Sequence, residues 1–111
     1  MPVKIKAQNT FESVHQVVAL IPSGKVTTYG AIANYLGLKG GARVVGYAMN
    51  AAPRGIPAHR VVNRLGELSG RKSFETPDMM QERLEKEGLV IVKDKIKDFK
   101  AHFWDPSVAL G

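Results

Sequence analysis

The sequence predicts a mainly α-helical domain that carries a small β ribbon and a helix-turn-helix. Two helix-like segments separated by a glycine-rich turn predict the helix-turn-helix, and a helical repeat of apolar residues precedes them. A stretch rich in proline and glycine follows, in which short apolar pairs flank a turn. The chain has 111 residues, the length of one ordinary domain, so we expect residues 1–111 to fold as a single unit.

The first helix is expected to begin near Phe11. Asn9 followed by Glu12 has the spacing of a capping box, and Pro22 with Gly24 would end the helix. Its apolar residues recur at three- and four-residue steps and would form one buried face: Phe11, Val14, Val17, Val18 and Ile21.

The helix-turn-helix is expected over residues 29–51. A short extended piece ends at Thr27 or Thr28, and either hydroxyl can cap a helix over 29–36. Glycines fill the turn at 37–41, and a second helix is expected over 42–51. One face of that helix is apolar, and the opposite face is slim, with one cation at its start: Arg43, Gly46, Tyr47 and Asn50. Such a face can press closely on a flat partner; an ordinary helical hairpin is the alternative.

The second half of the chain contains the ribbon and one more long helix. The apolar residues of "RVV" and "EL" flank the turn "NRLG" and predict a two-stranded ribbon within residues 60–68. Thr76 and Pro77 suggest an N-cap and a first-turn proline for a helix that ends at Gly88. A strand "LVIV" and a lysine-rich segment follow, and we expect a tail over 100–111 whose residues from His102 to Trp104 pack back on the domain.

Composition favours a polyanionic partner. Lys and Arg outnumber Asp and Glu by 16 to 10, for a formal net charge of +6, although solvated lysines are the alternative. The chain has no cysteine, which excludes disulfides and thiol catalysis, and no metal or other cofactor is expected. It has no apolar run of about eighteen residues, and its lysine-broken N-terminus lacks a signal-peptide core. We therefore expect a cytoplasmic protein, nucleoid-associated if bacterial, without a membrane partner.

Five blocks in order carry a family resemblance: "IPSGKVTTYGAIA", "ARVVGYAM", "IPAHRVV", "GELSG" and "LEKEG". Over about residues 11–92 they resemble the C-terminal domain of the alkylguanine-DNA alkyltransferases, whose hallmark is Pro-Cys-His-Arg-Val. The resemblance implies a winged-helix-like domain. Ala58 stands where those enzymes keep the alkyl-accepting cysteine, and Arg71 stands where they commonly have tyrosine. In both respects the chain is similar to the alkyltransferase-like proteins, which bind alkylated guanine without repairing it.

One further departure concerns the loop before Ala58. Ala52-Pro53 replaces an Asn-Pro pair that is usual in the enzymes, so the hydrogen bonds which that asparagine makes are absent.

The resemblance also implies roles for individual residues. Arg43 would enter the base stack and fill the space left by a flipped nucleotide, while Tyr29 would press on the target phosphate. Gly46 would let the second helix approach the minor groove. A flipped-base pocket would include Tyr29, Ala58 and Arg71, with Arg71 donating hydrogen bonds to the alkylated guanine.

Other matching residues receive weaker expectations. His59 and Glu87 match the histidine and glutamate that activate the thiolate in the enzymes, but without a nucleophile we expect both to be non-catalytic. Arg60 is expected to contact DNA, and basic neighbours around the same loop could contact phosphates: Arg54, Arg64 and Lys72. Removal of a sulfur atom at position 58 should leave space for adducts larger than methyl.

Three functions remain open from the sequence. The leading hypothesis is a non-enzymatic, monomeric sensor that flips 6-O-alkylguanine in double-stranded DNA and directs it to nucleotide excision repair proteins. An alkyltransferase domain inactivated by a Cys-to-Ala change is the first alternative. A helix-turn-helix regulatory or architectural protein is the second.

Overall fold

The structure is a computed structural model that describes Ile5 and residues 9–111. Residues 1–4 and 6–8, which bear on the interpretation of the N-terminus as lacking a signal peptide, lie outside the described residues. The elements follow in the order α1 (Thr10–Ala19), β1 (Thr27–Thr28), α2 (Tyr29–Leu36), α3 (Gly41–Asn50), a 3₁₀ turn (Ala58–Arg60), β2 (Val61–Val62), a second 3₁₀ turn (Arg71–Ser73), α4 (Met79–Lys86), β3 (Ile91–Val92), β4 (Lys95–Ile96), α5 (Phe99–His102) and α6 (Pro106–Ala109). Mostly helical with two small sheets, the fold confirms the predicted class.

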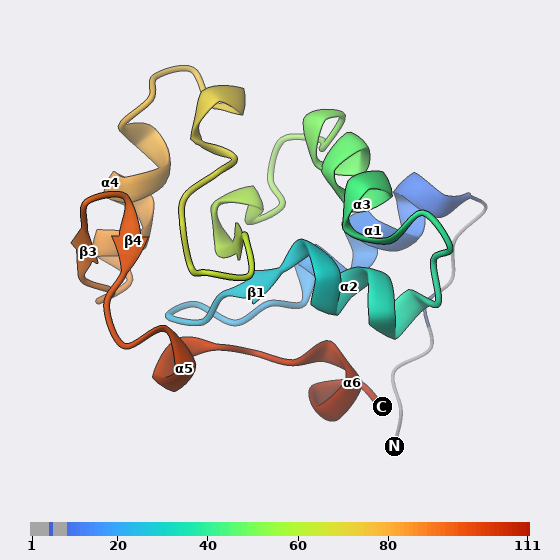
Figure 1. Ribbon diagram of the computed structural model, residues 1–111. Coiled ribbons are helices and arrows are strands. Elements are labelled where there is room, and N and C mark those ends of the chain that lie inside the picture. Colours follow the sequence, from blue (N-terminus) through green and yellow to red (C-terminus); the bar gives the residue numbers. More distant parts are fainter. Residues whose placement is uncertain (1–4, 6–8) are drawn as a thin grey trace.

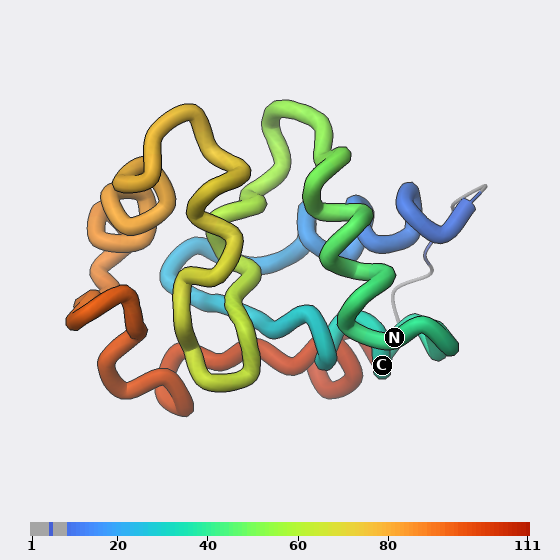
Figure 2. The backbone as a smooth tube through the Cα atoms, turned by 45° about the horizontal axis from the view of Figure 1, so that its top comes forward, coloured from blue at the N-terminus to red at the C-terminus, as the bar shows by residue number. Residues whose placement is uncertain are grey.

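Two apolar clusters divide the core. One joins α1, α2, α3 and α6, and the other joins α4, the β3–β4 hairpin and the segment around Leu68. The β1–β2 pair links them, because Val61 belongs to the first cluster whereas the adjacent Val62 belongs to the second. Figure 2 shows the chain between α3 and α4, coloured lime to gold, running between the two groups of helices. This connecting segment forms one wall of the candidate site.

The expected start of the first helix is confirmed. The Asn9 side chain accepts a hydrogen bond from the Glu12 backbone N–H at 2.9 Å, which satisfies one of the donors that a helix start leaves free. Val14, Val17 and Val18 are fully buried. On the same helix His15 donates through Nε2 to the Ala48 carbonyl at 2.7 Å, and this bond fixes α1 against α3.

The helix-turn-helix is confirmed as well. The hydroxyl of Thr28, one of the two threonines considered, caps α2 by accepting from the Ala31 N–H at 3.0 Å. Gly37 ends α2 in the left-handed region, with φ of 65°, which glycine adopts at no steric cost. On α3, Val45 and Ala48 are buried, whereas Arg43 and its neighbours on the slim face point away from the core.

The ribbon predicted within residues 60–68 is wrong. β2 pairs in parallel with β1, with Thr27 opposite Val61 and Thr28 opposite Val62. The Asn63 side chain explains the difference, because its Oδ1 accepts from the N–H groups of both Leu65 and Glu67 at 3.0 and 2.9 Å. These bonds close a compact turn that leaves no antiparallel ladder after it.

The antiparallel hairpin lies instead between β3 and β4. Its two turn residues, Lys93 and Asp94, both have positive φ, at 51° and 61°, as a tight hairpin turn of the primed type requires. Lysine is not a usual residue for this turn, so the sequence offered no hairpin signal there.

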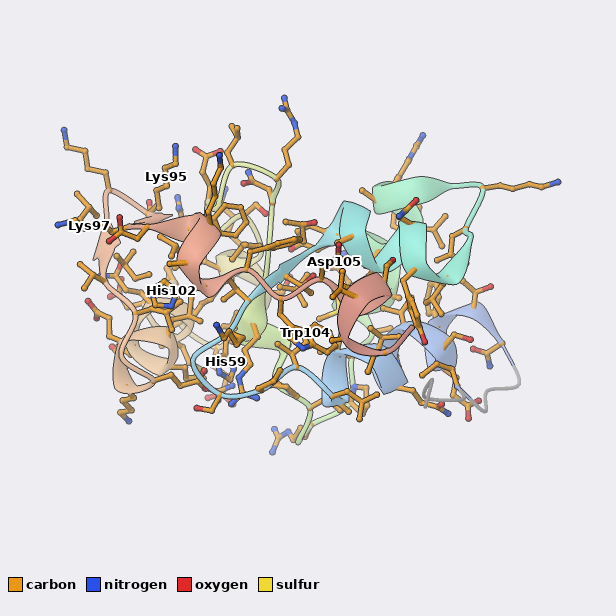
Figure 3. All side chains as sticks on the ribbon, turned by 90° about the horizontal axis from the view of Figure 1, so that it is seen from below. His59, Lys95, Lys97, His102, Trp104 and Asp105 are labelled. Atoms are coloured by element: carbon orange, nitrogen blue, oxygen red, sulfur yellow. The ribbon has the colours of Figure 1, made fainter. Side chains whose placement is uncertain are left out.

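Of two predictions for the last third of the chain, the start of the helix is wrong and the packing of the tail is confirmed. Helix α4 begins at Met79, so Thr76 and Pro77 do not start it; the Thr76 carbonyl accepts from the Met79 N–H in a turn that precedes the helix. The tail packs back as expected, since Trp104 N–H donates to the Val26 carbonyl at 2.7 Å and Val26 N–H donates to the His102 carbonyl at 3.0 Å. Figure 3 shows Trp104 and Asp105 on the strand-like segment between α5 and α6.

Candidate nucleic-acid interface

A cavity of about 270 Å³ opens beside the slim face of α3, and we call it the first cavity. It lies between the start of α2, the outward side of α3, the 3₁₀ turn at Ala58 and the segment 69–74. One wall is the connecting segment and the other is formed by α2 and α3, so the shape of the cavity depends on how α2 and α3 sit against that segment. The lining residues are Tyr29, Arg43, Gly46, Tyr47, Met49, Asn50, Ala58, Ser69, Gly70, Ser73 and Phe74.

Tyr29 is the first residue of α2, because Thr28 caps the helix immediately before it. Its hydroxyl lies close against Gly70, where an added Cβ would come within 2.9 Å of the hydroxyl oxygen. That separation is shorter than carbon and oxygen atoms tolerate without movement. Gly70 therefore makes the room that Tyr29 occupies in the cavity wall.

Arg43 projects from the first turns of α3 and is held by Tyr47 one turn later. The Arg43 Nε donates to the Tyr47 hydroxyl at 2.9 Å, and the guanidinium carbon lies 5.9 Å from the centre of the tyrosine ring. Tyr47 itself is 51% exposed. Gly46 lies between them, and an added Cβ would meet no atom within 4 Å. The surface thus presents a flat cation, a ring and a bare backbone patch on one helix face.

A cluster of charged groups lies behind Ala58. The carboxylate of Glu87 accepts from His59 Nε2 at 2.7 Å, from Arg60 Nη2 at 2.7 Å and from the Gly24 backbone N–H at 3.0 Å. Arg60 also donates through Nη1 to the Ile21 carbonyl at 2.7 Å. Glu87 therefore connects three segments that are distant in sequence.

The protonation states of this cluster follow from its contacts. Burial would raise the pKa of Glu87, but the hydrogen bonds from Arg60, His59 and Gly24 outweigh burial and lower that pKa to about 2. Burial is the main cause that lowers the pKa of His59, and the attraction of Glu87 opposes it only in part. His59 is accordingly neutral at pH 7, with its proton on the nitrogen that faces Glu87.

The arrangement keeps a base but lacks a nucleophile. His59 Nδ1 is buried and has no hydrogen-bond partner among the described residues. The residue immediately before His59 is Ala58, whose side chain is a methyl group, and the chain contains no cysteine. No thiol is present to accept an alkyl group, whatever the basicity of the imidazole.

Two arginines form ion pairs that the sequence did not predict. Arg60, expected to contact DNA, has a side chain only 17% exposed and engages Glu87, so its guanidinium is not offered to a phosphate. Arg71, expected in the pocket, is absent from the lining of the first cavity; its Nη1 lies 2.6 Å from Asp94 of the β3–β4 turn, in an ion pair that is partly exposed. Tyr29 and Ala58, the other two residues expected in the pocket, do line it.

The remaining basic residues are divided between the two sides of the domain. Arg54 lines a second cavity, described below, and Arg64 lines a hollow together with Tyr29. Lys72 is exposed in the 3₁₀ turn beside the first cavity. Figure 3 shows Lys95 and Lys97 pointing outwards at the β3–β4 end of the domain.

Seven residues of the first cavity were not among the predicted site residues, although two of them, Tyr47 and Asn50, were assigned to the slim face: Tyr47, Met49, Asn50, Ser69, Gly70, Ser73 and Phe74. The i to i+4 spacing of Arg43 and Tyr47 on a helix was a usable signal for their contact. Nothing local in the sequence marks Ser73 and Phe74, because only the path of the connecting segment brings them to α3.

No helix within the described residues, Ile5 and 9–111, has the length and apolar character needed to cross a membrane. Over the same part of the chain, His, Asp and Glu side chains form no group of three that could hold a metal ion.

Comparison with known proteins places this geometry. Residues 9–89 match the family described as 6-O-methylguanine DNA methyltransferase, DNA binding domain. Alkyltransferase-like protein 1 of Schizosaccharomyces pombe is 36% identical over 102 residues, which covers 86% of this chain and 94% of the relative. The chain belongs to the alkyltransferase-like family.

Two further relatives of this alkyltransferase-like chain agree. The DNA base-flipping protein of Escherichia coli is 36% identical over 107 residues, covering 92% of the chain and 80% of the relative. The crystal structure of the S. pombe protein in complex with damaged DNA containing O6-carboxymethylguanine matches with a TM-score of 0.72 at 36% identity, over 85% of this chain and 93% of that one. The predicted fold and family are confirmed.

Proposed function

We propose that the protein is a non-enzymatic sensor of 6-O-alkylguanine in double-stranded DNA, acting as a single domain over residues 1–111. The observation that carries the proposal is the first cavity, which has the Ala58 methyl in its wall and the exposed Arg43 at its edge. A cavity of this kind beside a flat cation suits capture of a base turned out of the duplex. Because the chain has no thiol, the captured base would be bound but not dealkylated.

Base flipping requires compensation for a lost stack. Turning a nucleotide out of a duplex costs a few kcal/mol. The guanidinium of Arg43 is planar and charged, so it can stack between the neighbouring bases and occupy the vacated space. Its contact with Tyr47 holds it away from the core before DNA arrives. Gly46 allows the α3 backbone to approach the minor groove, and Tyr29 would press on the phosphate of the flipped nucleotide.

Arg71 is proposed to read the flipped base after a change of partner. An exposed ion pair contributes about 0–1 kcal/mol, so release from Asp94 costs little. Its chain neighbour Gly70 lines the cavity, which puts Arg71 at the rim. Once released, the guanidinium could donate hydrogen bonds to the oxygen or ring nitrogen of the alkylated guanine.

The partners follow from the same reasoning. The first is double-stranded DNA that contains an alkylated guanine, in line with the relative crystallised on DNA containing O6-carboxymethylguanine. Because a bound lesion remains unrepaired, a second system must remove it, and we propose nucleotide excision repair proteins for that step. The protein would act as a monomer.

A binding titration tests the proposal. Matched duplexes with guanine or 6-O-methylguanine at one position are titrated at stated salt, and the recovered DNA is analysed for the adduct. We expect tighter binding to the modified duplex and full recovery of the methyl group. Equal affinities would support a regulatory or architectural DNA-binding protein instead, and loss of the methyl group would show an enzyme.

The inactivated-enzyme alternative has its own test. His59 and Glu87 keep the geometry that activates a thiolate, so the alternative is a specific one. The variant Ala58→Cys is mixed with DNA that carries a radiolabelled methyl group. Rapid, stoichiometric transfer to the protein would favour an alkyltransferase that has lost its cysteine, whereas a sensor pocket should transfer little.

A further inference from the structure

A second cavity adjoins the first. Its volume is about 350 Å³, compared with about 270 Å³ for the first cavity. The first lies just below the roughly 300–1,000 Å³ typical of small-molecule sites, and the second lies near the lower end of that range. The two share five lining residues: Met49, Asn50, Ala58, Ser73 and Phe74. A group too long for the first cavity therefore has the second as its nearest sheltered space.

The boundary between the two cavities includes the methyl group of Ala58 and one exposed hydrogen bond, between Ser73 and Asn50. Ala58 lines both cavities, and its methyl group occupies less space there than the side chain of a cysteine would. Across the same boundary, the Ser73 hydroxyl donates to Asn50 Oδ1 at 2.9 Å and joins the connecting segment to α3. Both side chains are exposed, and a neutral hydrogen bond in contact with water contributes little net stability.

The two cavities are lined by different charged residues, and Arg43 belongs to the first alone. Arg54, Arg83 and Glu75 line the second cavity and not the first, so the second contains two guanidinium groups and one carboxylate. Arg83 also borders a neighbouring hollow beside His59 and Arg60. Arg83 lies over the ring of Phe74, with 5.6 Å from its guanidinium carbon to the ring centre, and Phe74 is part of the wall that both cavities share. Neither arginine forms an ion pair with any residue in the described part of the chain. Their charges remain available to a ligand.

We propose that the second cavity receives the far end of a long 6-O-alkyl group, and that Arg83 and Arg54 favour ends that carry a carboxylate. The proposal rests on the proposed function, because the alkylated base must first occupy the first cavity. A carboxylate matches the fork of a guanidinium in a way that an alkyl end or an ammonium does not. Glu75 adds repulsion against anions, but it is outnumbered.

The test uses a series of duplexes that differ in one base: guanine, 6-O-methylguanine, and the 6-O-butyl, carboxypropyl and aminobutyl derivatives. We expect the carboxypropyl duplex to bind about three- to tenfold more tightly than the butyl duplex, as a charge-assisted bond that is partly exposed should give, and the aminobutyl duplex more weakly. In Arg83→Gln with Arg54→Gln this ranking should collapse, while the ratio of the affinities for the 6-O-methylguanine and guanine duplexes is retained, since a lost phosphate contact would affect both duplexes alike. Arg83→Lys should keep part of the preference, and Lys97→Gln, on the far end of the domain, should keep all of it.

The outcomes separate the two proposals. If 6-O-methylguanine is bound no better than guanine, the proposed function itself is wrong. If methylguanine is preferred but the three long tails bind alike in the unsubstituted protein, the second cavity does not read tails and only this inference is overturned. A carboxylate preference that survives in the double variant overturns the assignment to these arginines. Equal weakening of every duplex, guanine included, would show that the arginines contact phosphates instead.

Discussion

Gly46 offers the sharpest test of how α3 meets DNA, because one methyl group should have opposite effects on stability and binding. In the free protein an added Cβ at this position meets no atom within 4 Å, so Gly46→Ala introduces no clash. Gly46 is half-buried, and replacing a glycine inside a helix by alanine without a clash gains about 1 kcal/mol, which corresponds to roughly 4–8 °C in melting temperature for a domain of this size. The protein should become more stable.

Binding should move the other way. If the α3 backbone at Gly46 lies in the minor groove, a methyl group must displace the helix or the sugar edges it touches. Overfilling a packed interface costs about 1–3 kcal/mol, which is roughly five- to 150-fold in affinity. The weakening should appear on unmodified DNA as well, since groove contact does not depend on a lesion.

Thermal unfolding followed by circular dichroism and fluorescence anisotropy with labelled duplexes measure the two effects on the same samples. Val108→Ala is the control, because Val108 on α6 is 82% exposed and its truncation should leave DNA affinity unchanged. A Gly46→Ala protein that gains stability and binds unmodified DNA as well as before would refute the placement of α3 in the groove.

Three other perturbations address the residues around the cavity. Tyr47→Phe should weaken binding to a modified duplex about two- to fivefold in an anisotropy titration, since only the hydroxyl that holds Arg43 is lost. Arg60→Gln should lower the free energy of unfolding by about 3 kcal/mol in urea titrations, because the Glu87 carboxylate, only 12% exposed, loses its main partner. The salt dependence of DNA binding should stay the same, and a shallower dependence would show that Arg60 contacts a phosphate. The free energy of unfolding should fall as the pH falls below about 6.5, because His59 takes up a proton in the unfolded chain more readily than in the folded protein, where burial lowers its pKa. It should fall again by about 3 kcal/mol between pH 4.5 and about 2, as Glu87 is protonated. This second loss should vanish in Glu87→Gln, and a Glu87→Gln protein with an unchanged acid profile would contradict the lowered pKa of Glu87.

Local signals were sufficient for the helical part of the fold. The caps at Asn9 and Thr28 and the apolar spacing of α1 depend on residues within one or two turns, and each behaves in the structure as its chemistry suggests. The error in the ribbon has a different origin. Val61 and Val62 have the pattern of a strand but pair with residues more than thirty positions earlier, and no short window of sequence contains that partner.

The candidate site divides in the same way. Tyr29, Arg43, Gly46 and Ala58 line one cavity, and each belongs to an element with a clear local pattern. The ion-pair partners of Arg60 and Arg71 could not be predicted, because they come from distant parts of the chain. Charge and position relative to a motif do not reveal that Glu87 or Asp94, 27 and 23 residues further on in the sequence, takes up the guanidinium.

The Glu87 cluster has a consequence for how this family should be sorted. Removing His59, Arg60 or Glu87 would strand a buried charge or polar group, so folding alone is enough reason for the chain to retain all three after the alkyl acceptor has gone. Their presence in a homologue therefore reports an intact interior and carries no information about turnover. A survey that counts repair enzymes by the His-Arg-Val run and its distant glutamate will include chains that can only bind. The side chain that decides whether transfer can occur is the residue before the histidine, a thiol in the enzymes and here the methyl group of Ala58.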